Sequence, residues 1–485
     1  MTWTRSLSTG RPAAASNSGS PSGWRIGTRF GSAAAALSIV LAPPPLAAQV
    51  IGAQTSTAYE HAVAAGYKAI TLCEGVIAAG RTEAQVEALE LRGIYSEYQP
   101  LLPKLRATID RAKRNVSVTF PGDLPPRLAQ WAPRTGCVLQ PIGRAIAPWP
   151  ASSSNTPLPA PGDRRPWPMG DGGIAPRPSP ALAGTIGRAF DRTTYKGETV
   201  GVVVVRDGRI IAERYADGFG PFVSNRTWSV AKSIAGTLVG VAARDLRIDP
   251  MKPANIPEWD HSADPRRAIT LDNLLRMASG LHSDHYGNRT DAIYFGGTTV
   301  TEQVPGWPIE VRPGTRFRYA NNDIMLAARA VRATMKNDTR YAAWPSRLFE
   351  PLGMQHTTAG TDWQGNFILS SQVYTTARDL ARLGQFWLQD GVWQGKRLLP
   401  AGWMRYMTTP SGPQPADGPG YGATMWLFGA KQGLPAGSYS AQGNRGQYVM
   451  VVPSERLVIV RRGEDHGSGR FDIARFTADV IRDLK

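Results

Sequence analysis

The chain of 485 residues lacks the features that mark several large classes of protein. It has only two cysteines, no apolar run long enough to span a bilayer and no run of five or more basic residues. Its six histidines show no H-x-x-x-H spacing, and no G-x-S-x-G elbow occurs. We therefore expect neither a disulfide-rich scaffold nor a membrane-spanning protein, no nucleic-acid partner, no metal or other cofactor, and no α/β-hydrolase triad.

Acidic residues are scarce at the N-terminus. The net charge is +17, and the first 48 positions contain no acidic residue, while basic residues precede an apolar run from Ala33 to Ala42. Small residues that suit signal cleavage end near Ala48. We predict that residues 1–48 are a signal peptide and that the protein is exported, to be periplasmic or secreted. The alternative is a disordered tail rich in Ala, Ser and Pro.

The two cysteines bear on the same question. An exported pair can close a disulfide, whereas a cytosolic pair usually stays reduced. We predict a bridge between Cys73 and Cys137; the alternative is two small buried apolar side chains. The remaining positive charge is scattered, which suits a protein that works near anionic material such as cell wall or lipid headgroups.

Proline and glycine divide the chain into segments. Helical periodicity runs from position 57 to 114, and residues 49–145 are predicted to be a helical N-terminal extension. Residues 146–177 are dense in Pro, Ser and Gly, which predicts a linker or an arm that follows the surface. For residues 178–485, strand pairs near both ends indicate an α+β domain. Its antiparallel sheet would be built from both ends, flanked by helices, with an inserted helical subdomain.

The segment TWSVAKSIAGTLVGVAARD, residues 227–245, places a serine at a helix N-terminus and a lysine one turn later. Ser229 and Lys232 would share one helix face, and the helix N-terminus offers backbone N–H groups to a developing oxyanion. A desolvated lysine can lose its proton near neutral pH and activate a serine. Taken alone, however, the spacing fits a helix start with a solvated lysine better.

Two further segments change this interpretation. Tyr319-Ala320-Asn321 precedes a helix, and Ala441-Gln442-Gly443 lies on or just before a strand. Together, Ser-x-x-Lys, Tyr-x-Asn and small-x-Gly resemble the serine β-lactamase and penicillin-binding superfamily. The resemblance is closest to class C-like hydrolases, which include esterases and 6-aminohexanoate-dimer hydrolases. It covers roughly residues 181–485 and implies a β-lactamase/transpeptidase-like fold.

The resemblance also implies a role for each matching residue. Ser229 would be acylated, Lys232 and Tyr319 would transfer its proton, and Asn321 would hydrogen-bond Lys232 or the substrate, or cap its helix. The backbone N–H groups of Ser229 and Asn444 would form the oxyanion hole. The rival motif Tyr286-Gly287-Asn288 lies in a polar loop with no helix signal after it. The predicted substrate contacts are Trp228, Tyr286, Asp291, Gln442, Gly443 and Arg445.

One position departs from the superfamily pattern. β-Lactamases and peptidases usually have Lys or His where this chain has Ala441, and that cation helps to bind the substrate carboxylate. Its absence resembles the aminohexanoate-dimer hydrolase branch, although Arg445 could supply the charge. We predict a serine hydrolase acting on a small-molecule ester or amide, with a cell-wall-derived compound among the candidates. The alternatives are a D-alanyl-D-alanine peptidase or β-lactamase, and a catalytically silent cell-wall-binding protein on the same fold.

Overall fold

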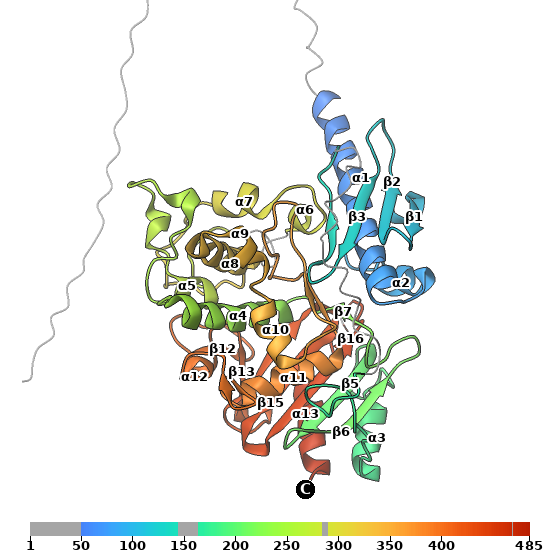
Figure 1. Cartoon of the computed structure of the whole chain (residues 1–485), viewed down its shortest axis with the longest axis vertical. Coiled ribbons are helices and arrows are strands. Elements are labelled where there is room, and N and C mark those ends of the chain that lie inside the picture. The colour runs from blue at the N-terminus through green and yellow to red at the C-terminus, as the bar shows by residue number, and fades with distance from the viewer. Residues whose placement is uncertain (1–49, 144–162, 284–289, 468) are drawn as a thin grey trace, which may run out of the picture. The chain divides into compact units, whose positions relative to one another are not determined.

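The centre of the structure, a computed structural model, is a seven-stranded antiparallel sheet (Figure 1). The structure describes residues 50–143, 163–283, 290–467 and 469–485. β16 from the end of the chain pairs with β5 from the start of the main domain, so both ends build one sheet, as predicted. Its strands, in sheet order, are β12 (Gly420–Tyr421), β13 (Trp426–Phe428), β14 (Ser438–Gly443), β15 (Gln447–Val452), β16 (Leu457–Gly463), β5 (Thr199–Arg206) and β6 (Arg209–Tyr215).

The two faces of this sheet are apolar in alternation. Val203 and Val205 of β5 belong to one core cluster, whereas Val202 and Val204 belong to the other, because successive side chains of a strand point to opposite faces. The smaller cluster lies under α3 (Pro180–Arg188) and α13 (Ile473–Asp483). The larger cluster includes α11 (Ala377–Leu388) and α4 (Val230–Leu246). Both faces are therefore covered by helices.

The segment between β6 and β12 contains the predicted helical insertion. Its central pair is α4 and α8 (Asn321–Met335), which pack together in the larger core. A small antiparallel sheet, in the order β7–β9–β8, lies beside the start of α4. The remaining elements are β7 (Asn225–Arg226), α5 (Leu271–Leu275), α6 (Asp291–Tyr294), α7 (Val300–Gln303), α9 (Asp338–Ala342), α10 (Ser346–Leu352), β8 (Thr358–Ala359), β9 (Val373–Thr375), β10 (Val392–Trp393), β11 (Lys396–Arg397) and α12 (Trp403–Thr408).

The N-terminal extension is not purely helical, and the prediction is wrong from Arg106 onward. It begins with α1 (Val50–Leu72), a π-helical turn and α2 (Glu83–Leu89), and continues as a four-stranded antiparallel meander. Along β2, fully buried side chains such as Val116 and Val118 alternate with more exposed ones, as expected for a strand. This alternation covers only a few residues, so the sequence alone did not distinguish it from helical periodicity. The strands are β1 (Arg106–Asp110), β2 (Asn115–Thr119), β3 (Arg127–Ala132) and β4 (Gly136–Leu139).

The predicted disulfide is present in the extension. It joins Cys73, the first residue of the π-helical turn after α1, to Cys137 on β4, with a Cα–Cα distance of 6.1 Å. The bridge closes a segment with a sequence separation of 64 residues. It therefore ties the helical half of the extension to its sheet.

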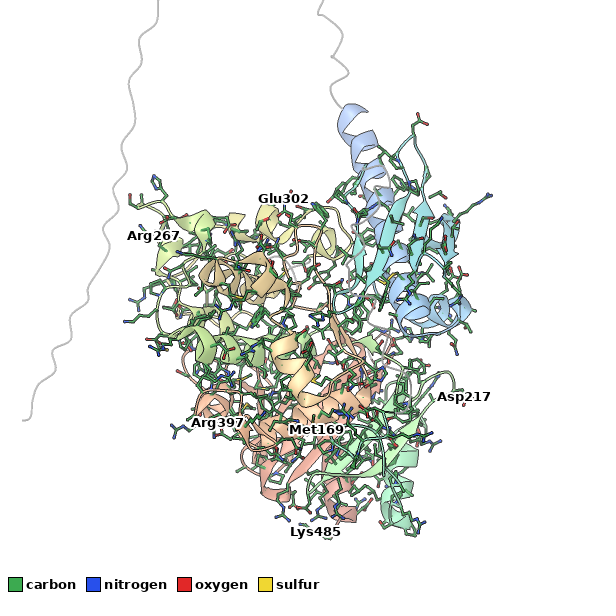
Figure 2. All side chains as sticks on the ribbon, viewed as in Figure 1. Met169, Asp217, Arg267, Glu302, Arg397 and Lys485 are labelled. Atoms are coloured by element: carbon green, nitrogen blue, oxygen red, sulfur yellow. A yellow bond between two sulfur atoms is a disulfide. The ribbon has the colours of Figure 1, made fainter. Side chains whose placement is uncertain are left out.

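Part of the Pro-rich segment is an arm that lies on the hydrolase domain. Trp167 Nε1 donates to Gly208 O at 3.0 Å, and Arg382 Nε donates to Pro168 O at 2.6 Å. Met169, labelled in Figure 2, accepts from Trp393 Nε1 at 3.3 Å. Residues 163–177 thus follow the alternative of a surface-hugging arm. The predicted signal peptide and the first part of the linker lie outside the described residues.

No helix within the described ranges has the length and apolar composition needed to cross a membrane.

Candidate active site

Ser229 stands at the N-terminus of α4. It follows Trp228, whose left-handed backbone (φ 50°) turns the chain from β7 into the helix. The Ser229 side chain does not cap α4, so its Oγ is available to a neighbour on the next turn. Val230, Ala231 and Ile234 are fully buried, and this apolar packing keeps the first turn of α4 out of solvent.

Lys232 meets Ser229 as the Ser-x-x-Lys spacing predicts. Its Nζ lies 3.0 Å from Ser229 Oγ, 2.7 Å from Asn321 Oδ1 and 2.9 Å from Ser370 O. Only 1% of Lys232 is exposed. Burial, and secondly the charge of Arg226, lowers the pKa of Lys232 to about 7. Near neutral pH a large fraction of this amine is therefore neutral and able to accept a proton.

Tyr319 lies on the other side of the Lys232 amine. Lys232 Nζ is 4.8 Å from the centre of its ring, and its hydroxyl faces Ser229. Burial raises the pKa of Tyr319 well above its ordinary value, although the contact with Ser229 opposes this shift. Tyr319 is therefore a neutral phenol that can donate a proton. Trp426 and Tyr421 hold its ring, at centroid distances of 5.5 and 6.1 Å.

Asn321 is the first residue of α8, so the alternative of an N-cap is wrong. The N-cap is Ala320, which makes no side-chain cap. The Asn321 side chain instead accepts from Lys232 through Oδ1, and its Nδ2 donates to Thr290 Oγ1 at 3.4 Å. Asn321 thus fixes the position of the Lys232 amine relative to the serine.

The end of β14 lies against the start of α4. A Cβ on Gly443 would come within 2.3 Å of Thr227 O and 3.1 Å of Ser229 N, so only glycine permits this approach. Gln442 is half-buried on the same strand, and Asn444 is exposed directly after it. The predicted oxyanion donors, the backbone N–H groups of Ser229 and Asn444, therefore belong to two segments that lie against each other.

Arg445 does not fit its predicted role as a substrate contact. Its guanidinium is buried, with Nε 3.1 Å from a carboxylate oxygen of Glu464 and Nη2 3.0 Å from His466 Nε2. The backbone turns into the left-handed region at Arg445 (φ 57°), which explains why the side chain leaves the line of β14. Ala441, two residues before Gly443 on β14, is fully buried in the larger core.

The other predicted substrate contacts are placed unevenly. Trp228 is directly beside the serine and almost fully buried. Asp291 is buried at the first position of α6. Tyr286 lies outside the described residues.

Sequence reasoning missed Ser370 and Arg226. Ser370 accepts from Lys232 through its carbonyl, and its Oγ lies 2.8 Å from Tyr294 Oη. Arg226 stacks on Trp228, with its Cζ 3.8 Å from the ring centre. In the sequence, Arg226 is distinguished only by its position three residues before Ser229. Neither Arg226 nor Ser370 belongs to one of the motifs.

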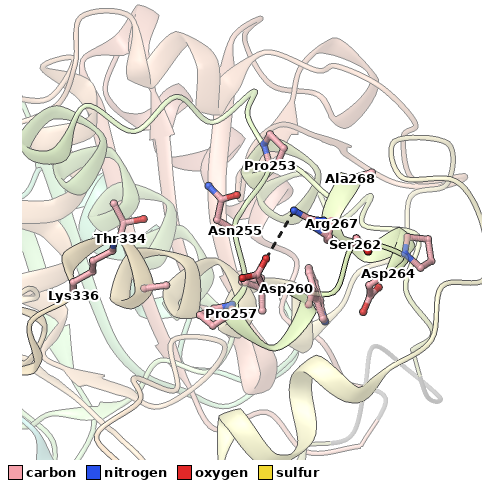
Figure 3. Close-up of a pocket in the computed structure, with 14 residues that line it drawn as sticks. Pro253, Asn255, Pro257, Asp260, Ser262, Asp264, Arg267, Ala268, Thr334 and Lys336 are labelled. Carbon is pink, nitrogen blue, oxygen red and sulfur yellow. Dashed lines mark ion pairs between the residues drawn. The ribbon is translucent and has the colours of Figure 1, made fainter.

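A large hollow lies away from this chemistry. Its volume is about 900 Å³, and it is formed by the loop from Pro253 to Ala268 and the end of α8 (Figure 3). Asp260 and Arg267, which pair at 3.8 Å, border it. None of the predicted catalytic residues lines it. The described part of the chain contains no group of three or more His, Cys, Asp or Glu side chains arranged to hold a metal ion.

Comparison with known proteins identifies the family. The sequence profile of the β-lactamase family matches residues 188–478, which is more than half of the chain. The chain belongs to the β-lactamase family. This family includes β-lactamase-like hydrolases with the same core fold, and the predicted fold class is confirmed.

Individual relatives cover the hydrolase part of the chain. The 6-aminohexanoate-dimer hydrolase of Paenarthrobacter ureafaciens is 28% identical over 285 residues, covering 53% of this chain and 71% of the relative. A structure from Bacillus anthracis, described as a candidate 6-aminohexanoate-dimer hydrolase, has a TM-score of 0.52 and 22% identity, covering 62% of this chain and 81% of that one. A family VIII carboxylesterase has a TM-score of 0.52 and 15% identity, covering 64% and 99%. The two structural matches show the shared fold.

Proposed function

We propose that this protein is an exported serine hydrolase that cleaves a small ester or amide through an acyl-enzyme on Ser229. One observation carries the proposal: Lys232 Nζ lies 3.0 Å from Ser229 Oγ, and burial lowers the pKa of this lysine to about 7. A partly neutral lysine can accept the hydroxyl proton at neutral pH, whereas an ordinary ammonium cannot.

The first half-reaction forms the acyl-enzyme. Ser229 Oγ attacks the carbonyl carbon of the substrate, and its proton passes to the neutral amine of Lys232. The N–H groups of Ser229 and Asn444 stabilise the oxyanion of the tetrahedral intermediate. When this intermediate collapses, the C–O or C–N bond breaks, and the phenol of Tyr319 protonates the leaving alcohol or amine. Lys232 returns a proton to Tyr319.

The second half-reaction releases the acid. Water attacks the acyl carbon, and its proton passes to the Lys232–Tyr319 pair. The ester bond to Ser229 then breaks, and Ser229 Oγ regains a proton. The pair acts as base and acid in both halves, which is possible because Lys232 titrates near neutral pH while Tyr319 stays protonated.

The site supports neutral substrates over β-lactams. Ala441 supplies no cation, and the guanidinium of Arg445 is paired with Glu464. A charge-assisted hydrogen bond to the carboxylate of a penicillin or cephalosporin would be worth about 1.5–3 kcal/mol. Its loss lowers the rate by about tenfold to a hundredfold if it acts in the transition state. The name of the Paenarthrobacter relative places an amide among the substrates to test.

The test is covalent labelling by a fluorophosphonate, followed by a substrate panel. We expect wild type to be labelled and Ser229→Ala to lose labelling. Ser233→Ala, one turn further along α4 with Oγ bonded to Thr424 O, is the matched control and should keep it. Labelling that persists in Ser229→Ala would remove this serine from the mechanism. Wild type that is never labelled and turns over none of the panel would favour a catalytically silent protein.

The panel compares p-nitrophenyl butyrate, a linear amide dimer and nitrocefin. We expect kcat/KM for the ester to exceed that for nitrocefin. A preference for nitrocefin that is lost in Arg445→Ala would instead identify a β-lactamase whose cation has moved. Below pH 7 the ester kcat/KM should fall about tenfold per pH unit, because Lys232 becomes protonated.

A further inference from the structure

The N-terminal extension meets the hydrolase domain through an aromatic cluster. Phe295, directly after α6, packs against Tyr67, Tyr95 and Tyr98 of the extension, with ring centroids 4.6, 5.0 and 6.1 Å away. Such contacts add specific geometry to the burial of apolar surface. The extension is therefore packed into the hydrolase domain beside α6.

The backbones of the two parts also approach closely there. A Cβ on Gly66 of α1 would lie 2.2 Å from Phe295 O, so glycine is required at this contact. Arg127 of β3 is buried and donates to Gly296 O at 3.0 Å, as well as to Ala62 O and Gln140 O within the extension. The extension thus holds the turn that follows α6 by both packing and hydrogen bonds.

One side chain connects this interface to the serine. Arg226 of β7 is buried; its Nη2 donates to Ser371 Oγ at 2.9 Å, and its guanidinium stacks on Trp228 at 3.8 Å. Tyr95 faces the same guanidinium, which also lies 5.2 Å from the ring centre of Tyr294, the residue before Phe295. The chain of contacts therefore runs from the extension through Arg226 and Trp228 to the residue that precedes Ser229.

We propose that Arg226, which faces Tyr95 of the N-terminal extension, is a positioning residue that orients the Trp228–Ser229 turn and places a fixed positive charge near the Lys232 amine. The extension is then part of the catalytic apparatus. This inference rests on the proposed function, because it assigns Lys232 the role of the base.

The groups around the two cations agree with this role. The titratable side chains that face Arg226 are the tyrosines Tyr67, Tyr95, Tyr294 and Tyr374, which burial keeps neutral by raising the pKa of each. Arg226 therefore keeps its charge in this setting. Lys232 faces Tyr319, which is also a neutral phenol. Burial is the largest cause of the lowered pKa of Lys232, and the charge of Arg226 is the second. The acidic side chain of Asp291 acts on two of these tyrosines, Tyr95 and Tyr294.

The test measures the rate of fluorophosphonate labelling of Ser229 between pH 5.5 and 9 in the full-length protein. In Arg226→Gln the positive charge is lost, so the acid limb of the profile should move to higher pH by about half a pH unit or more. In Arg226→Lys the charge remains, but the two hydrogen bonds from the guanidinium to Ser371 O and Oγ are lost. We expect its limb to stay at the wild-type pH and its maximal rate to fall about threefold to tenfold. An Arg226→Gln limb that stays at the wild-type pH would overturn the electrostatic role.

A second pair of variants tests the part played by the extension. Tyr95→Phe removes the hydroxyl that faces Arg226, and its maximal rate should fall about threefold to tenfold. Tyr67→Phe is the matched control, because its hydroxyl donates to Glu90 O at 2.6 Å within the extension, and its rate should stay close to wild type. Equal rates in the two variants would overturn the coupling, even if Arg226→Gln failed to fold.

The two proposals fail in different ways. If wild type is not labelled at Ser229, the proposed function is wrong. If wild type is labelled as expected but the Arg226 and Tyr95 variants behave like Tyr67→Phe, only the present inference is wrong.

Discussion

Two buried lysines distinguish the extension from the hydrolase domain. Lys68 in α1 and Lys232 in α4 are 6% and 1% exposed. Lys68 Nζ donates to Leu105 O at 3.1 Å and pairs with a carboxylate oxygen of Glu87 at 2.8 Å. The three hydrogen-bond partners of Lys232 are all uncharged oxygens, and the nearby charged group that acts on it is the cation Arg226.

The difference shows how neighbouring groups decide whether a buried lysine amine stays charged or can exchange a proton. A carboxylate beside a buried ammonium makes it an anchor between elements, here between α1, α2 and the segment before β1. Uncharged acceptors hold an amine in place without stabilising its charge, and a nearby cation destabilises that charge further. Lys232 is therefore suited to proton transfer, whereas Lys68 is suited to stabilise the extension.

Exchanging each lysine for methionine should have the largest effect and separate the two roles. We expect Lys232→Met to lower the fluorophosphonate labelling rate and the ester kcat/KM about a thousandfold, because no base remains for Ser229. Lys68→Met should leave both rates within about threefold and lower the free energy of unfolding by about 1–3 kcal/mol, since two carbonyl groups lose a donor. Urea unfolding measures the second effect. A comparable loss of rate in both variants would show that the two lysines do not have different roles.

Removing the disulfide tests how far the extension depends on its own covalent link. For a separation of 64 residues between Cys73 and Cys137, loop entropy predicts a loss of about 4 kcal/mol in unfolding free energy. The double variant Cys73→Ala/Cys137→Ala should show this loss in urea, and wild type treated with a reductant should match it. Two free thiols in protein purified from an oxidising compartment would contradict the prediction.

Gly443→Ala tests the contact between β14 and the start of α4 in the hydrolase domain without changing a titratable group. The added methyl would lie 2.3 Å from Thr227 O and push β14 away from the start of α4. We expect the labelling rate of Ser229 to fall about a hundredfold, the loss associated with one oxyanion donor. Gly429→Ala, where an added Cβ meets nothing within 4 Å, is the control and should be labelled at the wild-type rate. A Gly443→Ala protein labelled normally would show that the contact does not position the site.

The smallest expected effect concerns a buried acid in the extension. Burial raises the pKa of Glu74 to about 8, although Cys137 N donates to its Oε1 at 2.7 Å. Between pH 4.5 and 8 the unfolded chain releases this proton while the native state keeps it, so the stability of wild type falls as pH rises. Glu74→Gln removes the effect. Its unfolding free energy should improve relative to wild type by on the order of 2 kcal/mol from pH 6 to pH 7.5, measured in urea. A constant difference across this range would show that Glu74 ionises normally.

Local patterns predicted the hydrolase domain well. The strand pairs at both ends led to the sheet in which β16 joins β5, and three short motifs led to Ser229, Lys232, Tyr319 and Asn321, which the structure brings together. The sheet prediction is confirmed because strand alternation is a local property, and the Ser229–Lys232 contact follows from helix spacing, which is also local. The meander from Arg106 to Leu139 was missed, because its strands are only four to six residues long and no residue of the first, β1, is buried.

The direction of a side chain at a turn was also beyond local patterns. Arg445 was expected to face the substrate, but a left-handed backbone turns it to Glu464, which lies on a segment after the next strand pair. Nothing in the residues adjacent to Arg445 specifies that partner. The same holds for Ser370, whose carbonyl reaches Lys232 across 138 positions of sequence.

Short motifs in the sequence were enough to name the candidate catalytic residues and the elements that present them: a serine and a lysine one helical turn apart, a tyrosine and an asparagine before a second helix, and a glycine that ends a strand. The surroundings of the lysine, and the packing of the extension against the hydrolase domain, depend on the folded structure. The pKa of Lys232 depends on its burial and on Arg226, and Arg226 in turn faces Tyr95, 131 positions earlier in the chain. Charge and desolvation act through space, so residues distant in sequence set the protonation of the Lys232 amine.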